Sequence, residues 1–198
     1  MSPRLKSVTF VELLIAIMLL SVIILAINGM DIFSRNQIVS SNQRTRVQND
    51  VSRCLEHIAK NASNTVGNEA TYGADTAVYI SPDFNNTTTL AFFADINGNG
   101  ARDANTDDYW VGYNLNTTSH NFQYCNHCAN ATCVSCSGTA EVLAQDITAF
   151  SASKNFTNGN YVNVTITGCW DPTRTCGAFD NPSVNLSTTI ALPSLSTH

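Results

Sequence analysis

Seven cysteines are the residues of this 198-residue chain best suited to covalent or metal chemistry. Six of them lie in its C-terminal half: Cys125, Cys128, Cys133, Cys136, Cys169 and Cys176. The first four form two CxxC pairs separated by four residues, and the last two enclose a second loop. Two CxxC pairs can bind zinc tetrahedrally through four thiolates, but such sites usually have a longer insert between the pairs. We therefore expect disulfides, with zinc as the alternative.

The sequence does not determine how these cysteines pair. Six cysteines allow fifteen pairings, and nothing in their spacing selects one. The seventh, Cys54, lies in a predicted helix and leaves at least one thiol without an intramolecular disulfide partner, bound to another subunit or to a metal. Disulfides form in oxidising compartments, so the cysteines favour a domain outside the cytoplasm.

A second candidate metal site is a loop of oxygen donors. Asp95-Ile96-Asn97-Gly98-Asn99-Gly100 matches the D-x-N-x-N-G opening of calcium loops, in which alternate side chains point at the ion. Its candidate ligands are Asp95, Asn97, Asn99, Asp103 and Asp107. The position where the full motif has Glu is Thr106, so Asp107 or Asp108 would have to replace it. Because Asp, Asn and Gly also favour plain turns, calcium binding and an ion-free turn both remain open.

One acidic residue stands out near the N-terminus, within the apolar run VTFVELLIAIMLLSVIILAI of Val8–Ile27. About twenty residues of helix span the hydrocarbon core of a membrane, and a carboxylate there is costly unless it has a partner. Arg4 and Lys6 precede the run and favour a cytoplasmic N-terminus. Glu12 is therefore a functional candidate, whereas a simple signal anchor is the alternative.

The segment KSVTFVELLIAI resembles the cleavage and methylation motif of type IV prepilins and type II secretion pseudopilins, usually written G-F-T-L-V-E-L-L. The resemblance implies cleavage between Ser7 and Val8 and methylation of the new amino group of Val8. Ser7 stands where the family usually has Gly, and Val8 where it usually has Phe. The resemblance further implies that Glu12 pairs with the Val8 amino group of a neighbouring subunit in a filament.

This resemblance implies a structural protein that is not an enzyme. Its expected partners are other pilin subunits, a prepilin peptidase, an inner-membrane assembly platform and the membrane. Its expected location is the inner membrane as a precursor, and then an extracellular or periplasmic filament. The net charge of −5 argues against nucleic-acid binding. The alternative is a membrane-anchored extracellular binding module that uses the calcium-like or Cys-rich loop.

These residues need a long helix and a sheet to position them. After the leader, residues 1–7, apolar residues at three- and four-residue steps predict one helix over 8–60, whose half 8–27 is transmembrane. Gly29 is a candidate for local unwinding, although a tolerated glycine explains it equally well. Residues 61–198 are rich in Asn, Thr and Ser, with alternating strand patterns and no βαβ signal. The predicted strands are Thr76–Ile80, Thr88–Ala94, Tyr109–Leu115, Val142–Ser151, Asn160–Thr167 and Val184–Leu192.

The expected fold class is therefore α+β, with the helix packed on an antiparallel sheet in a pilin-like arrangement. The order of the strand segments in this domain resembles minor pilins of the PilW type and J-type pseudopilins. Charged residues make up 13% of the chain and hydrophobic residues 43%. A disproportionate share of this apolar content lies in the run Val8–Ile27, and the rest of the chain is a polar, Asn/Thr-rich domain.

Overall fold

The computed structural model describes residues 9–65, 78–81, 89–96, 108–128, 131–133, 136–155 and 161–192. The chain divides into two compact units, Met1–Asn42 and Gln43–His198, which are described separately below. The predicted leader and the processing residues Ser7 and Val8 lie outside the described residues. The structure is of the α+β class, as the sequence predicts, with one long helix and antiparallel sheets.

The helix α1 runs from Phe10 to Ala62 and is continuous through Gly29. In the first unit its large apolar side chains are exposed, from 42% at Leu14 to 77% at Phe10. Its most apolar window has a mean hydropathy of 3.0, so α1 is long and apolar enough to cross a membrane. The buried residues of α1 begin only at Val47.

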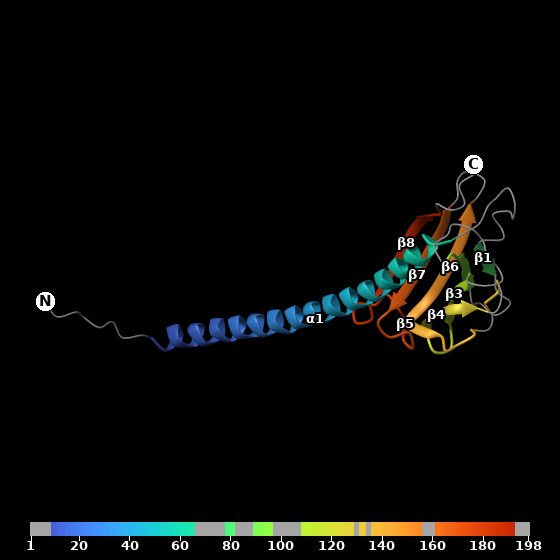
Figure 1. The fold of residues 1–198 in the computed structure, drawn as a ribbon. Coiled ribbons are helices and arrows are strands. Elements are labelled where there is room, and N and C mark those ends of the chain that lie inside the picture. The colour runs from blue at the N-terminus through green and yellow to red at the C-terminus, as the bar shows by residue number, and fades with distance from the viewer. Residues whose placement is uncertain are drawn as a thin grey trace. The chain divides into compact units, whose positions relative to one another are not determined.

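Two antiparallel sheets make up the second unit together with the last part of α1 (Figure 1). The first sheet has the order β1-β2-β3-β4-β5 and the second β6-β7-β8. The strands are β1 (Val78–Ser81), β2 (Thr89–Ala94), β3 (Tyr109–Asn116), β4 (Asn121–Cys128), β5 (Glu141–Ala144), β6 (Ile147–Asn155), β7 (Tyr161–Cys169) and β8 (Ser183–Ala191).

Two predictions from the sequence need correction. Strand β4 was not expected, because its cysteines and polar residues suggested a loop, but it pairs with both β3 and β5. The single strand expected over Val142–Ser151 is two strands that belong to different sheets. The chain changes sheet at Gln145-Asp146, where Asp146 has a φ of 61°. Asp tolerates this left-handed conformation better than most residues, so it suits the turn.

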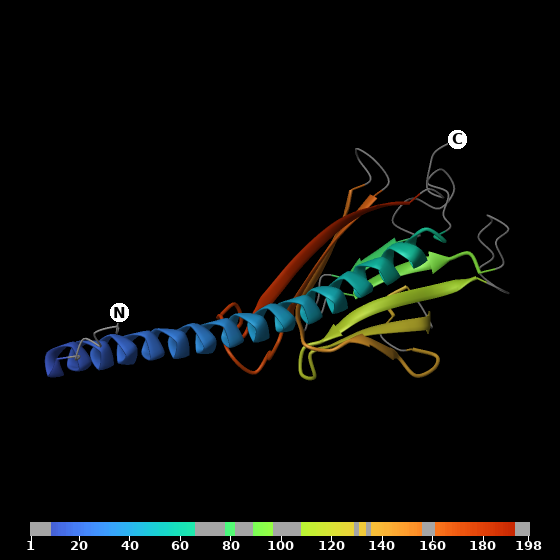
Figure 2. The same ribbon diagram turned by 90° about the vertical axis from the view of Figure 1, so that its left-hand side faces the viewer.

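One hydrophobic core joins the two sheets. Residues 47–62 of α1 lie across both sheets (Figure 2) and bury one stripe of side chains between them. The stripe consists of Val47, Val51, Cys54, Leu55, Ile58 and Ala62. The largest fully buried side chains of the core include Tyr113, Phe92, Phe122, Ile58, Leu90, Ile147 and Ile166. Each such apolar side chain contributes about 1.5–3 kcal/mol relative to its exposed state.

A polar cluster fixes the end of α1 on the first sheet. The amide Nδ2 of Asn61 donates to Tyr113 Oη at 2.6 Å, and Nδ1 of His57 lies 3.0 Å from the same oxygen. Tyr113 Oη in turn donates to the backbone oxygen of His57 at 3.2 Å. Burial raises the pKa of Tyr113 and lowers that of His57, because it disfavours the charged form of each. Both side chains therefore act as neutral hydrogen-bonding groups.

Gly168 of β7 lies directly against the side chains of Val47 and Val51 of α1. A Cβ atom added there would be 2.8 Å from Val47 Cγ1 and 2.9 Å from Val51 Cγ2. Both valines are β-branched and buried, so they cannot rotate freely out of the way. Position 168 therefore requires glycine, because any side chain there would overlap the valines of α1.

Gly168→Ala is expected to lower the free energy of unfolding by about 1–3 kcal/mol, the usual effect of overpacking a core. Gly138→Ala is the matched control, because a Cβ at Gly138 meets nothing within 4 Å. The control should change stability by less than about 0.5 kcal/mol. Chemical denaturation of the two variants measures the difference, and equal effects would contradict the proposed helix–sheet contact.

Candidate functional site

Glu12 forms a reciprocal hydrogen-bonded cap at the start of α1. Its backbone N–H donates to Thr9 Oγ1 at 3.3 Å, and its Oε2 accepts from Thr9 N at 2.9 Å and Thr9 Oγ1 at 3.1 Å. Thr9 precedes the first helical residue and Glu12 is the third, which is the spacing of a capping box. The carboxylate thus has partners within its own chain, a role that the sequence analysis did not identify.

The hydrogen bonds between Thr9 and Glu12 give this pair a structural role at the start of α1. A capping box satisfies backbone N–H groups that have no acceptor in the first helical turn. Glu12 also puts negative charge at the positive end of the helix dipole. These two effects explain an acidic residue here without any second subunit. Any role in assembly must therefore be tested separately from capping. The other predicted assembly residue, Val8, lies outside the described residues.

The six distal cysteines form three disulfides: Cys125–Cys136, Cys128–Cys133 and Cys169–Cys176. The first two are nested, since the pair 128–133 lies within the interval 125–136. Cys125, Cys128, Cys133 and Cys136 gather with Ala91 into a second, smaller apolar cluster. We call this the disulfide cap.

The cap covers the face of the first sheet opposite the main core. Ala91, Gly112 and Cys125 are neighbours across β2, β3 and β4. Val111 and Tyr113, which flank Gly112, belong to the main core. Because side chains alternate between the faces of a sheet, the row from Ala91 to Cys125 points away from the main core. This second cover explains why the five residues Leu90–Ala94 are all buried instead of alternating.

The disulfide cap requires a glycine at position 112. A Cβ there would lie 2.3 Å from Cys133 Sγ, 2.8 Å from Cys133 Cβ and 3.0 Å from Cys128 Sγ. The disulfide Cys128–Cys133 therefore sits directly on the backbone of β3. The sequence analysis missed this residue. A glycine between Val111 and Tyr113, inside an otherwise good strand pattern, was the available signal of close approach.

The disulfide Cys169–Cys176 closes a second loop, which is also fixed by the buried Asn181. The side-chain oxygen of Asn181 accepts from Asp171 N at 2.8 Å. Its amide nitrogen donates to the backbone oxygens of Asp171 at 3.0 Å and Thr175 at 3.1 Å. These three bonds hold the loop in one conformation, so the disulfide is one of several restraints there.

Cys54 is the free cysteine of the chain, and its side chain is fully buried on α1. Burial, and to a smaller extent the charge of Asp50, raises its pKa to about 12. The thiolate is the reactive form of cysteine, so this thiol is both inaccessible and chemically quiet. In the described structure, Cys54 serves as a small apolar residue of the core.

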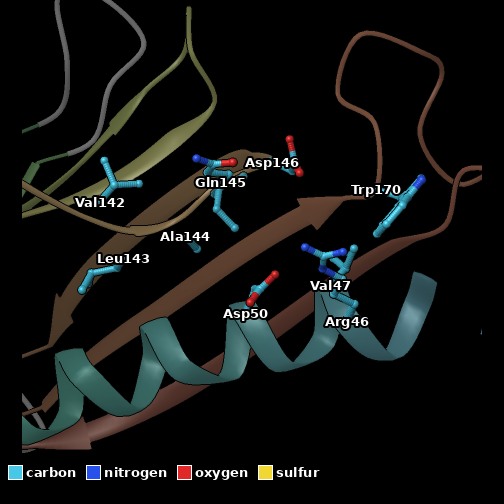
Figure 3. A pocket seen from close by; sticks show the side chains of 10 residues that line it. Arg46, Val47, Asp50, Val142, Leu143, Ala144, Gln145, Asp146 and Trp170 are labelled. Carbon is cyan, nitrogen blue, oxygen red and sulfur yellow. The ribbon is translucent and has the colours of Figure 1, made fainter. Parts of the chain in front are cut away.

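An open cleft of about 400 Å³ lies between α1, β5 and the start of the loop after β7 (Figure 3). It is lined by Arg46, Val47, Asp50, Val142, Leu143, Ala144, Gln145, Asp146, Ile147 and Trp170. The guanidinium carbon of Arg46 lies 5.5 Å from the centroid of the Trp170 ring, a cation–π contact. The sequence analysis did not predict this cleft, since its residues come from three separate segments.

The cleft combines two carboxylates with one guanidinium. The pKa of Asp146 is raised, first by loss of water around its carboxylate and then by the negative charges of Asp171 and Asp50. His120 and Arg46 partly oppose this effect. The described lining of the cleft contains no Ser, Cys or His side chain. The arrangement therefore offers charged and hydrogen-bonding contacts to a ligand.

Of the predicted calcium ligands, the structure describes Asp95 alone. Asn97, Asn99, Asp103 and Asp107 lie outside the described residues. Asp95 N donates to Asn64 O at 2.8 Å, and Ile96 N donates to the carboxylate of Asp108 at 3.1 Å. Asp108 thus braces the backbone where β2 ends. Calcium binding by this loop remains a prediction.

Comparisons of this chain with protein-family models, curated proteins and solved structures found no match. The proposed function therefore rests on the N-terminal motif and on three structural features: the capped apolar helix, the disulfide cap and the charged cleft.

The disulfides and the buried thiol predict a definite thiol count. The native protein should show no thiol that reacts with an aromatic disulfide reagent at pH 8, because Cys54 is buried. Denaturation without reductant should expose one thiol, and denaturation with reductant all seven cysteines. Cys54→Ser is the control that should abolish the single thiol. Three or more thiols in the denatured, unreduced protein would contradict the three disulfides.

Proposed function

We propose that this protein is a structural subunit of a filament of the type IV pilus or type II secretion pseudopilus kind. In this proposal a prepilin peptidase cleaves the chain between Ser7 and Val8 and methylates Val8. The mature subunit leaves the membrane and assembles through the N-terminal part of α1. The filament would be extracellular or periplasmic, and its assembly platform would lie in the inner membrane.

The observation that carries the proposal is the exposure of the apolar N-terminal half of α1. Large hydrophobic side chains from Phe10 to Ile27 are exposed around the whole helix in the first unit. A helix that is apolar on all sides needs an apolar environment on all sides. A membrane supplies this environment before assembly, and a bundle of identical helices supplies it afterwards. The polar second unit remains in water in both states.

Glu12 supports the assembly step by its position. It is the one carboxylate within the apolar stretch from Phe10 to Met30. In a bundle of helices its charge would be withdrawn from water, which is costly unless an opposite charge lies beside it. The methylated amino group of a neighbouring Val8 would supply that charge. An incoming subunit that lacks the pair leaves an unpaired buried charge, so the pair would select the register of assembly.

The alternative function is a membrane-anchored extracellular binding module. The cleft beside Arg46 and Trp170 is the observation that favours it, because a ligand or partner could occupy that space. In this alternative α1 serves only as an anchor, and the charge on Glu12 has no function beyond capping. The two functions therefore differ in what they require of Glu12.

Two substitutions separate assembly from capping. Glu12→Gln removes the charge but keeps a side chain that completes a capping box. Thr9→Ala removes the capping hydroxyl and costs about 1 kcal/mol at the helix start, while the charge stays. We expect Glu12→Gln to lower the amount of protein in isolated filaments at least tenfold, and Thr9→Ala to change it less than about twofold.

Immunoblots of sheared filaments and of membranes measure this incorporation in cells that contain the assembly machinery. Glu12→Ala, which removes both the charge and the side chain that caps the helix, should behave like Glu12→Gln. The thiol count of each variant controls for folding of the second unit. Normal incorporation of Glu12→Gln would contradict the charge-pairing role and favour the anchor.

A further inference from the structure

We propose that Cys125, Cys128, Cys133 and Cys136 form a zinc site when their two disulfides are reduced. One Zn²⁺ would then close the disulfide cap in place of two S–S bonds. This inference does not depend on the filament function, since it concerns the second unit alone. The four cysteines are all among the described residues.

Three of the four sulfur atoms already lie close together. The Sγ atoms of Cys125, Cys128 and Cys133 all lie within 4.8 Å of one another. The fourth, Cys136 Sγ, is bonded to Cys125 Sγ. In a tetrahedral site with Zn–S distances of about 2.3 Å, the sulfur atoms are about 3.8 Å apart. Cys136 Sγ lies outside this group of three, so a tetrahedral set of thiolates requires the Cys136 side chain to turn toward Cys128 and Cys133 once its bond to Cys125 is reduced.

Backbone contacts place Cys136, the last residue of the second CxxC pair, beside the first pair. Cys125 and Cys128 lie on strand β4, and Cys128 forms an antiparallel bridge with Cys136. Next to this bridge, Ser137 N donates to His127 O at 2.8 Å. The short insert between the pairs argues against zinc from the sequence alone. The bridge answers that objection, because it brings Cys136 of the second pair beside Cys128 of the first.

The surroundings suit a closed structural site. Cys125, Cys128 and Cys133 are buried, while Cys136 is partly exposed and provides access from solvent. The partly buried side chains of Tyr79 and Trp110 pack against this cluster. Four thiolate ligands leave no open position for a substrate, so the zinc would stabilise the cap rather than catalyse a reaction.

The absence of a side chain at Gly112 leaves room for the disulfide cap in both the oxidised and the zinc-bound state. The chain passes under Cys133 and Cys128 at a distance that excludes even one methyl group. This close approach is fixed by the backbone of β3 and by its pairing with β2 and β4. Zinc thiolates would occupy the volume that the Cys128–Cys133 bridge now fills.

A phosphine can serve as the reductant that converts the two disulfides to thiols. Two phosphines and two waters reduce the two disulfides to four thiols, and each phosphine becomes a phosphine oxide. One Zn²⁺ then binds four thiolates, and four protons leave for solvent. Zinc binding should therefore weaken as pH falls, because the ligands must be deprotonated. The oxidised protein has no free thiolate in the cap and should bind no zinc there.

The experiment uses the full chain in detergent, reduced with a phosphine, freed of reductant without oxygen and mixed with zinc chloride. After removal of unbound metal, we expect one zinc per chain, and less than a tenth of that in the oxidised protein. Zinc should slow alkylation of the four cap cysteines at least tenfold and leave Cys169 and Cys176 reactive. Cobalt(II) should give the visible spectrum of a tetrahedral thiolate site.

Matched variants assign the metal to the cap. Cys133→Ser should abolish retention of zinc, whereas Cys169→Ser, which also removes one distal thiol, should leave one zinc per chain. A variant in which Cys54, Cys169 and Cys176 are all Ser keeps only the four ligands, and it can be folded with or without zinc. Failure of both this variant and the reduced full chain to retain zinc would overturn the proposal. Equal loss of zinc in Cys133→Ser and Cys169→Ser would overturn it too.

Discussion

The packing of one helical stripe between two sheets is the interaction on which the second unit depends. The two sheets share no hydrogen-bonded strand pair in the described structure. Val47, Val51, Cys54, Leu55 and Ile58 of α1 join them into a single core. In the first unit the same helix exposes apolar side chains on all sides from Phe10 to Ile27. One helix thus has a buried stripe within the second unit and, in the first unit, a stretch long and apolar enough to cross a membrane.

A second constraint acts on the opposite face of the first sheet. A five-stranded sheet with a core on one side normally shows alternating burial, but β2 is buried on both faces. The disulfide cap provides the second cover with very few apolar residues, because sulfur atoms lie directly on Gly112. Covalent bonds there take the place of the large side chains that a loop rich in Asn and Ser does not have.

Much of this structure was predictable from local patterns. The spacing of Val47, Val51 and Ile58 predicts the buried stripe, and the fold class follows from the long helix and alternating strands. Strand β4 was missed because its cysteines suggested a loop, whereas its pairing with β3 and β5 is a long-range effect. The cysteine pairing, the role of Gly112 and the cleft depend on segments distant in sequence. The sequence T-x-x-E at Thr9–Glu12 indicates a capping box, but Glu12 was interpreted only as a carboxylate within a membrane-spanning run.

Mass spectrometry of the N-terminal peptide from isolated filaments tests the central claim most directly. A processed filament subunit requires a free, modified amino group close to Glu12. The account predicts a chain that begins at Val8 and carries one methyl group on its amino nitrogen. A chain in the cell envelope that still begins at Met1, with Arg4 and Lys6 intact, would contradict the account.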